Sequence, residues 1–389
     1  MFKIRTYNQI SSKGLDRFSR ERYEVGADID TPEAFILRSQ KLHSEPVPET
    51  LLGVARAGAG VNNVPVADYS ERGIVVFNSP GANANAVKEL VVTGLLMASR
   101  DIFTGMNYVQ GLTNITDAGE MAALLEKEKK QFAGSELTGK TLGVVGLGAI
   151  GAVVANMALQ LGMKVVGYDP ALSVEAAWRL SSSVEKMDNL QSLLARSDYV
   201  TLHVPALEAT RHMINAETLR GLKSGAALLN FAREEIVDTD AVVAALENGQ
   251  LRRFVTDFPV PSLLGRDNVV AMPHIGASTE EAEENCAVMA ADQLMDFLEN
   301  GNIRNSVNFP TTTMGRNGGH RITVSNANVP KVLSQVLAVI SDCNNNVIDL
   351  VNKSRGDVAY NIIDVEEVPD QRIVTAIEEI EGVKRVRLV

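Results

Sequence analysis

The sequence predicts an α/β protein with two doubly wound, Rossmann-like parallel-sheet domains, followed by a small C-terminal domain of order βαββαβ. Three observations support this. Short apolar runs alternate with helical patterns up to about residue 300. A glycine-rich turn, Gly146-x-Gly148-x-x-Gly151, joins a strand to a helix. The pattern changes after residue 318. A chain of 389 residues is long enough for two or three such domains.

The glycine turn lies in a complete dinucleotide-binding context. The apolar run 141–145 predicts a buried strand, 150–161 a helix, and 164–168 a second strand that ends at Asp169. Gly146 permits the turn, Gly148 lets the backbone approach a pyrophosphate, and Gly151 lets helix and strand pack closely. The helix N-terminus, which begins with Ala149 and Ile150, offers N–H groups to the phosphates. Asp169 would accept hydrogen bonds from ribose and repel a 2′-phosphate, which favours NAD over NADP. The alternative is a packed glycine turn without a ligand.

Composition excludes several classes of protein. The net charge is −11 without a basic block, which disfavours nucleic acid and membrane surfaces as partners. Cys286 and Cys343 are far apart and lack metal-ligand spacing, so neither a metal site nor a disulfide is expected. The N-terminal residues predict a first strand rather than a signal peptide, and no apolar run has the length of a membrane span. A cytoplasmic protein is expected.

The order of elements suggests the domain boundaries. Residues 1–97 and 281–310 are expected to form a substrate-binding domain, and residues 98–280 an NAD-binding domain. Within the first, residues 86–100 predict a helix, and 121–131 is a charged segment. Residues 301–318 are polar and rich in threonine and glycine, which predicts a linker. The C-terminal domain then spans 319–389, with strands expected at 321–325, 347–351, 358–365 and 383–389 and helices at 329–341 and 373–380.

Two side chains at predicted strand ends carry the chemistry of a 2-hydroxy-acid oxidation. Arg233 can bind a carboxylate through two parallel hydrogen bonds, although a surface salt bridge is the commoner fate of a single arginine. His274 follows an apolar strand and is followed by glycine and small residues. An imidazole exchanges protons near neutral pH, so His274 is the candidate base. A structural role is the alternative for a lone histidine.

These motifs together resemble the D-2-hydroxyacid dehydrogenase superfamily, and most of all the D-3-phosphoglycerate dehydrogenases that carry a C-terminal ACT domain. The matching segments occur in family order over essentially the whole chain: Leu37-Arg-Ser39, Arg56-Ala-Gly-Ala-Gly60, Asn78-Ser-Pro, Gly146 to Gly151, His203-Val-Pro205, Asn230 to Arg233, Asp257, and Pro273-His-Ile-Gly-Ala-Ser278. The resemblance implies NAD-dependent oxidation of 3-phosphoglycerate at C2 to 3-phosphohydroxypyruvate, the entry to serine biosynthesis, by a homodimer or homotetramer.

The resemblance also implies roles for individual residues. Arg233 and the backbone amides of Ala57 and Gly58 would bind the substrate carboxylate. Arg38 and Ser39, helped by Lys41, would face the phosphate. Asp257 would hold the nicotinamide carboxamide, and His274 would be the base. The remaining expected cofactor contacts are His203 and Pro205 on the adenosine side, and Phe231, Ala232 and Gly276.

One departure concerns the partner of the catalytic histidine. The family places a glutamate about five residues after the position of Asp257, whereas this chain has Ser262. A carboxylate beside an imidazole favours its protonated form, and serine cannot supply that effect. The glycine that usually follows the arginine is Glu234, followed by Glu235. We hypothesise that Glu234 or Glu235 partly replaces the missing acid. The alternative is that both are simply solvated, with reduced turnover and an acid-shifted pH profile.

The ACT resemblance implies an L-serine effector site at Asn326, Asn328 and Asn346. Their amides can donate and accept hydrogen bonds. The departure here is Lys331, where related chains often have glycine. The alternative is that these asparagines only cap a helix or shape turns.

Two other functions remain open. One is a neighbouring dehydrogenase of the hydroxypyruvate or glyoxylate reductase type. The other is a weakly catalytic NAD-binding regulatory protein, which the absent glutamate would fit.

Overall fold

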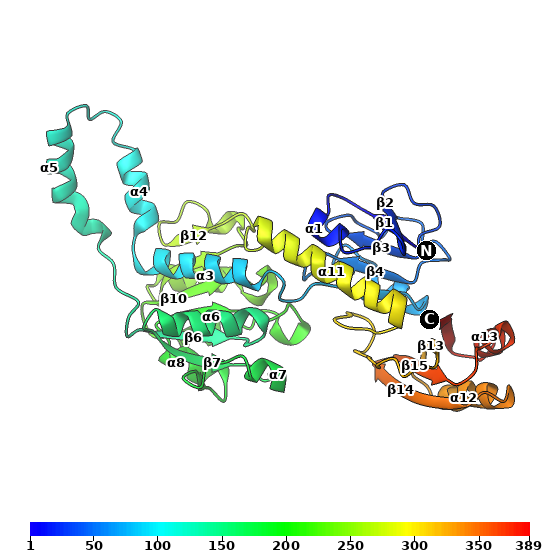
Figure 1. Cartoon of the computed structure of the whole chain (residues 1–389). Coiled ribbons are helices and arrows are strands. Elements are labelled where there is room, and N and C mark those ends of the chain that lie inside the picture. Colours follow the sequence, from blue (N-terminus) through cyan, green and yellow to red (C-terminus); the bar gives the residue numbers. More distant parts are fainter. The chain divides into compact units, whose positions relative to one another are not determined.

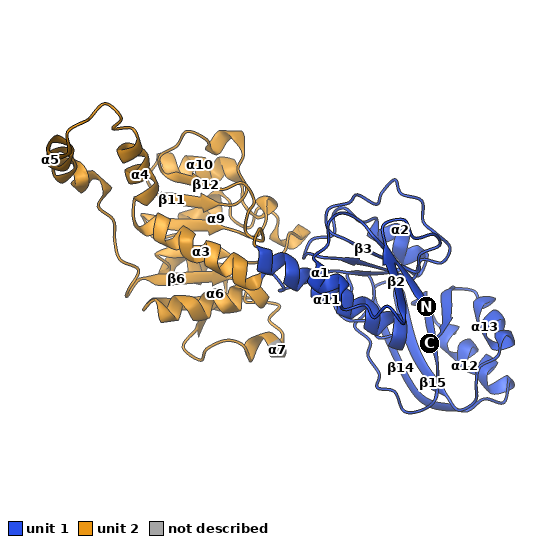
Figure 2. Cartoon of the chain, turned by 45° about the horizontal axis from the view of Figure 1, so that its top comes forward, with its two compact units in different colours: residues 1–83, 280–389 blue, residues 84–279 orange. Residues whose placement is uncertain are grey.

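The computed structural model describes residues 1–389, apart from the side chain of Glu175. The chain forms two compact units (Figure 2). Unit 1 contains residues 1–83 and 280–389, and unit 2 contains residues 84–279.

Unit 2 is built on a seven-stranded parallel sheet of order β12-β11-β10-β9-β6-β7-β8. Apolar clusters cover both faces of this sheet, as the uninterrupted apolar strands require. The strand order reverses between β6 and β9, so the carboxyl ends of these two strands form the expected ligand-binding edge. The strands are β6 (Thr141–Val145), β7 (Lys164–Tyr168), β8 (Glu185–Lys186), β9 (Tyr199–Leu202), β10 (Ala226–Asn230), β11 (Leu251–Thr256) and β12 (Val269–Ala271).

The helices of unit 2 connect these strands. They are α3 (Ala84–Ser99), α4 (Ile102–Gln110), α5 (Ala118–Glu128), α6 (Ala149–Gln160), α7 (Val174–Ala177), α8 (Leu190–Arg196), α9 (Ala216–Arg220) and α10 (Thr239–Glu247), with short 3-10 helices η1 (Lys129–Phe132), η2 (Glu208–Thr210), η3 (Glu234–Ile236) and η4 (Pro261–Leu263). Helices α4 and α5 stand away from the sheet (Figure 1), and neither has a buried residue among those described. We call residues 100–135 the arm.

Unit 1 begins with a five-stranded parallel sheet of order β2-β1-β3-β4-β5. The order reverses at β1 and β3, which places the residues after these two strands at the second expected ligand-binding edge. The elements are β1 (Phe2–Thr6), α1 (Ser12–Leu15), β2 (Tyr23–Gly26), β3 (Ala34–Leu37), β4 (Gly53–Arg56), α2 (Val66–Glu71), β5 (Val75–Phe77) and the long helix α11 (Glu280–Asn300).

The C-terminal part of unit 1 is a four-stranded antiparallel sheet of order β14-β15-β13-β16. Its elements follow the expected βαββαβ order: β13 (His320–Ala327), α12 (Val332–Asp342), β14 (Val347–Arg355), β15 (Val358–Val365), α13 (Gln371–Glu378) and β16 (Val383–Leu388). Ile322, Val324 and Ile363 pack under α12 and α13. The opposite face, with Tyr360 and Ile362, joins the core of the first sheet and α11.

Charged side chains fix this second face to the rest of unit 1. The buried Arg321 forms an ion pair with the buried Asp364 at 2.7 Å. Its guanidinium also donates to the carbonyls of Asn300, Met314 and Gly315 at 2.8–3.0 Å. The Tyr360 hydroxyl donates to the carbonyl of Gly301 at 2.8 Å. The C-terminal sheet is therefore covered on both faces.

Two expectations about boundaries need correction. The segment 301–318 is not a loose polar linker, because Ile303, Phe309 and Met314 are buried in the core of unit 1. The first boundary lies near residue 83 rather than 97, because α3 packs its apolar face on α6, β10 and β11. Among the described residues, no helix combines the length and apolarity needed to cross a membrane.

Candidate active site

The glycine turn after β6 shows three different reasons for glycine. Gly146 has φ +89°, and a Cβ there would lie 2.6 Å from the carbonyl oxygen of His203. A Cβ at Gly151 would lie 1.9 Å from the carbonyl oxygen of Gly146, so α6 can begin this close to the turn only with glycine. A Cβ at Gly148 meets no atom within 4 Å. Gly148 is thus unconstrained by the fold itself, which fits a backbone that a pyrophosphate must approach.

Asp169 is fixed against this turn. One carboxylate oxygen accepts a hydrogen bond from the Leu147 amide at 2.8 Å, and the other accepts from the Ala171 amide at 2.9 Å. A carboxylate has about four acceptor positions, so both bonds leave capacity for a ribose. The expected acid therefore also shapes the glycine turn.

His203 follows β9 at the edge where the strand order reverses. Its Nε2 lies 2.9 Å from the hydroxyl of the buried Thr201. Burial lowers the pKa of His203 from its ordinary value of 6.5 to about 3, because desolvation disfavours the charged ring. His203 is therefore uncharged at neutral pH, and so is the surface that His203 and Pro205 are expected to form against the adenosine.

Arg233 sits in a braced loop at the end of β10. Asn230, almost fully buried, accepts from the Ala232 amide at 3.1 Å and donates to the Arg233 carbonyl at 2.8 Å. The Arg233 guanidinium folds back to donate to the Ala232 carbonyl at 2.6 Å. Phe231 and Ala232 are themselves buried. From the sequence, Asn230 was identified only as part of a motif. The structure shows that its side chain also holds the loop that carries Arg233.

His274 is an exposed residue held in an uncommon conformation. Its φ is +58°, in the left-handed region that non-glycine residues rarely occupy. The buried Asp257 carboxylate accepts from the amides of Ile275 at 2.8 Å and Gly276 at 2.7 Å. Asp257, expected to face the carboxamide, thus also fixes the turn that carries His274.

The structure does not pair the proposed replacement acids with His274. Glu234 and Glu235 lie exposed on η3, and Ser262 lies exposed on η4. In the described part of the chain, no carboxylate forms an ion pair with the His274 imidazole. The ring instead meets Phe258 in an edge contact, with centroids 4.9 Å apart and planes at 63°.

The expected phosphate residues lie at the carboxyl edge of the first sheet of unit 1. Asn8, which follows β1 with φ +63°, accepts from the amides of Ser39 at 3.0 Å and Gln40 at 2.7 Å. The Arg38 guanidinium pairs with Glu283 of α11 at 2.6 Å. A second arginine, Arg56, is the last residue of β4 and donates from Nε to the Arg38 carbonyl at 3.0 Å. Asn8 and Arg56 are further candidate residues at this edge.

The expected amide donors of this edge are already engaged. The Ala57 amide donates to the Leu37 carbonyl at 2.8 Å, and the Gly58 amide donates to the Arg56 carbonyl at 2.9 Å. In this conformation, neither amide is available to the substrate carboxylate. The Ala57 amide is bonded to the end of β3, and the Gly58 amide closes a turn on the end of β4.

The three expected effector asparagines occupy different environments. Asn326 is buried, donates to the Ala327 carbonyl at 2.7 Å, and accepts from Asn361 at 2.8 Å. Asn328 donates to the Gly356 carbonyl at 2.9 Å. Asn346 is exposed and donates to Glu366 at 3.3 Å. Asn361 extends the cluster toward β14 through a 2.6 Å bond from Asn352.

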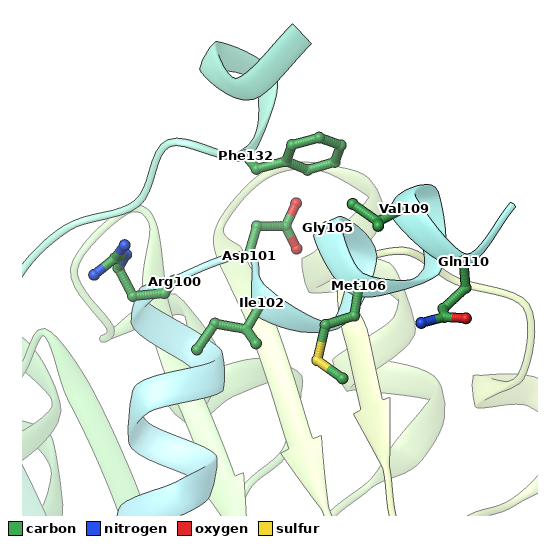
Figure 3. A pocket seen from close by; sticks show the side chains of 8 residues that line it. All are labelled: Arg100, Asp101, Ile102, Gly105, Met106, Val109, Gln110 and Phe132. Atoms are coloured by element: carbon green, nitrogen blue, oxygen red, sulfur yellow. The ribbon is translucent and has the colours of Figure 1, made fainter. Parts of the chain in front are cut away.

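A pocket also lies at the base of the arm, where α3 leads into α4 (Figure 3). Asp101, the residue before α4, pairs with Arg253 of β11 at 3.0 Å, which fixes the arm to the sheet. None of the expected site residues lines this pocket. Its lining residues are Arg100, Asp101, Ile102, Gly105, Met106, Val109, Gln110 and Phe132.

Comparison with known proteins agrees with this geometry. Residues 93–276 match the family of the NAD-binding domain of D-isomer-specific 2-hydroxyacid dehydrogenases. A D-3-phosphoglycerate dehydrogenase of Haemophilus influenzae is 32% identical over 351 residues, covering 87% of this chain and 81% of that protein. One of Synechocystis is 37% identical over 290 residues, covering 72% of this chain and 50% of that protein. The chain thus spans about half the length of the Synechocystis relative.

Solved structures share the fold. NAD⁺-bound 3-phosphoglycerate dehydrogenase of Entamoeba histolytica is 25% identical, with a TM-score of 0.61 over 79% of this chain and 98% of the other. D-mandelate dehydrogenase of Rhodotorula graminis is 25% identical, with a TM-score of 0.65 over 80% of this chain and 99% of the other.

The doubly wound unit, its glycine turn and these matches define an NAD-binding protein of the D-2-hydroxyacid dehydrogenase class. The prediction of NAD as cofactor is confirmed. Within that class, the chain belongs to the D-3-phosphoglycerate dehydrogenase family.

Proposed function

We propose that the protein oxidises 3-phospho-D-glycerate at C2 to 3-phosphohydroxypyruvate with NAD, the first step of L-serine biosynthesis. The family membership supports the substrate. The main support for an oxidation at C2 is the turn that carries His274 and that Asp257 fixes. This turn lies at the same carboxyl edge of the sheet as the glycine turn and Arg233.

In this proposal each residue has a defined task. Bound NAD supplies the hydride acceptor. Gly148 and the first amides of α6 hold its pyrophosphate, and Asp169 its ribose. His274 accepts the proton of the C2 hydroxyl, and Arg233 turns outward from the Ala232 carbonyl to bind the carboxylate.

Substrate recognition is assigned to arginines of unit 1. Arg38 and Ser39 bind the phosphate, with Lys41 adding positive charge to an otherwise acidic protein. The phosphate must compete with Glu283 for Arg38. This pair is about 40% exposed on each side, so water screens it and a doubly charged phosphate can displace the carboxylate.

NADH formation with 3-phosphoglycerate tests this function directly. Wild-type protein should turn over, and His274→Asn should lose activity by about a hundredfold or more, because a positioned general base contributes 10²–10⁴-fold. His43→Asn, an exposed histidine in unit 1, is the matched control. Preferential turnover of glyoxylate or hydroxypyruvate would move the assignment to a neighbouring dehydrogenase. NAD binding with no turnover on a 2-hydroxy-acid panel would instead indicate a regulatory protein.

We also propose that the βαββαβ domain is an ACT domain that binds L-serine near Asn326, Asn328 and Asn346. Its element order supports this, and so does the buried pair of amides formed by Asn326 and Asn361. Millimolar L-serine should inhibit the wild-type enzyme, and Asn346→Ala should abolish the inhibition. Asn107→Ala, on the arm, is the control. A serine-insensitive wild-type enzyme would contradict the proposal.

We further propose that the protein forms a homo-oligomer through the arm. Ile102, Phe103, Met106 and Val109 of α4 are 42–62% exposed, and a contiguous apolar stripe of this kind favours a protein contact. Met106→Glu should shift the sedimentation of the native protein toward a smaller species. An unchanged oligomer, or a wild-type monomer, would contradict this.

A further inference from the structure

Three consecutive residues at the end of β11, Thr256 to Phe258, hold the turn that carries His274. We call this set of contacts the clamp. The buried Thr256 accepts the Phe258 amide on its hydroxyl at 3.0 Å, and its carbonyl accepts the Met272 amide at 2.8 Å. Asp257 holds the amides of Ile275 and Gly276.

This clamp fixes the backbone of His274 but not its ring. A non-glycine residue with φ near +58° is strained, and the two hydrogen bonds that the Asp257 carboxylate accepts are strong enough to maintain this conformation. Those bonds reach only the backbone that follows His274. The exposed imidazole would still rotate about its side-chain bonds without a further contact.

Phe258 supplies that contact. Its ring is half-buried, its backbone is anchored by Thr256, and its edge arrangement with the imidazole is the geometry that aromatic pairs prefer. Ser262 is exposed, and its hydroxyl offers the ring no charge. We propose that Phe258 is the positioning residue of the His274 imidazole, in place of a carboxylate partner. This inference rests on the proposed function, in which His274 is the base.

An aromatic partner differs from a carboxylate in one testable way. It restricts the orientation of the ring, but it does not offer a negative charge to the protonated imidazole. Introducing an acid by Ser262→Glu should therefore shift the pH dependence of kcat for oxidation to higher pH, because the base must lose its proton first. It should also restore an enzyme that has lost the Phe258 ring.

The test compares Phe258→Leu, Phe258→Tyr and the double variant Phe258→Leu/Ser262→Glu, with Leu264→Ala as a control for disturbance of the same loop. Leu264 is 63% exposed. Phe258→Leu should lower kcat about threefold to tenfold, the effect of one lost aromatic contact. The dissociation constant for NAD should stay within about twofold, because the glycine turn is untouched. Phe258→Tyr and the double variant should recover most of the rate. A Leu264→Ala effect as large as that of Phe258→Leu would overturn the proposal.

A second readout does not depend on activity. In histidine-labelled protein, the His274 ring signals, assigned from His274→Asn, should carry a ring-current displacement that disappears in Phe258→Leu and persists in Phe258→Tyr. Identical signals in wild type and Phe258→Leu would overturn the positioning role. Wild-type protein that shows the displacement but oxidises no 2-hydroxy acid would instead overturn the proposed function.

Discussion

Gly148→Ala separates cofactor binding from folding. A Cβ at this position meets no atom within 4 Å, and the backbone, with φ −68° and ψ −157°, is extended. Alanine at a compatible glycine position changes stability by about +0.4 to +1 kcal/mol, because it restricts the unfolded chain. We therefore expect the variant to fold as well as wild type.

The same methyl group should weaken NAD binding. It occupies the side of the turn that the pyrophosphate must approach, and displacing the phosphate loses one amide hydrogen bond to a charged group. Such a bond is worth about 1.5–3 kcal/mol, so the dissociation constant should rise about tenfold to a hundredfold. Calorimetric titration with NAD measures the affinity, and urea unfolding followed by circular dichroism measures stability.

Two matched variants make the result decisive. Gly315→Ala adds a methyl group that also meets no atom within 4 Å, but in unit 1, and it should leave NAD affinity unchanged. Gly151→Ala places its Cβ 1.9 Å from the Gly146 carbonyl oxygen, and overpacking of this kind costs about 1–3 kcal/mol or more. Wild-type affinity in Gly148→Ala would refute the pyrophosphate site, and destabilisation equal to that of Gly151→Ala would refute the packing argument.

Three further predictions concern stability. The pKa of His203 is lowered from 6.5 to about 3 in the fold, so between these pH values the unfolded chain binds a proton that the native protein does not. The unfolding free energy should therefore fall with decreasing pH by up to about 1.4 kcal/mol per pH unit, and denaturant titrations of His203→Asn should lack this component of the slope. Lys331, the residue before α12, has φ +80°. Lys331→Gly should therefore raise the unfolding free energy by up to about 1 kcal/mol, because glycine adopts this φ without strain. A lower unfolding free energy in the variant would show that contacts of the lysine side chain outweigh the strain of its backbone. Arg321→Met should cost about 3–5 kcal/mol, because it leaves the buried Asp364 charge unpaired, and Arg321→Met/Asp364→Leu should cost less than the single change; a larger cost in the double variant would contradict this account.

The sequence alone predicted those features of the site that depend on the spacing of residues within one short segment. The glycine turn, the acid at the tip of β7 and the polar residues at strand ends all follow from one chain segment each, and the alternation of strands and helices predicted both parallel sheets. The roles of Asn8 and Asp257 were missed because each accepts hydrogen bonds from backbone that only the fold brings near. Asn230 bonds only to the backbone two and three residues further along the chain, so its role could have been inferred from the local sequence. Asp257 was predicted to contact the cofactor. Nothing in the sequence indicates that its carboxylate also accepts hydrogen bonds from two backbone amides of a turn that begins eighteen residues away.

The linker prediction shows a different limit of sequence patterns. Ile303, Phe309 and Met314 are isolated apolar residues among polar ones, so no helical or strand periodicity marks them, yet each is buried. They pack in the hydrophobic core of unit 1. Arg321 also donates to the carbonyls of Asn300, Met314 and Gly315, which ties both ends of the segment to the C-terminal sheet. Asn300 is also the last residue of α11, the helix that begins six residues after His274. An effector signal from the C-terminal domain would therefore enter the rest of unit 1 through a packed face at the end of α11, rather than through a flexible hinge.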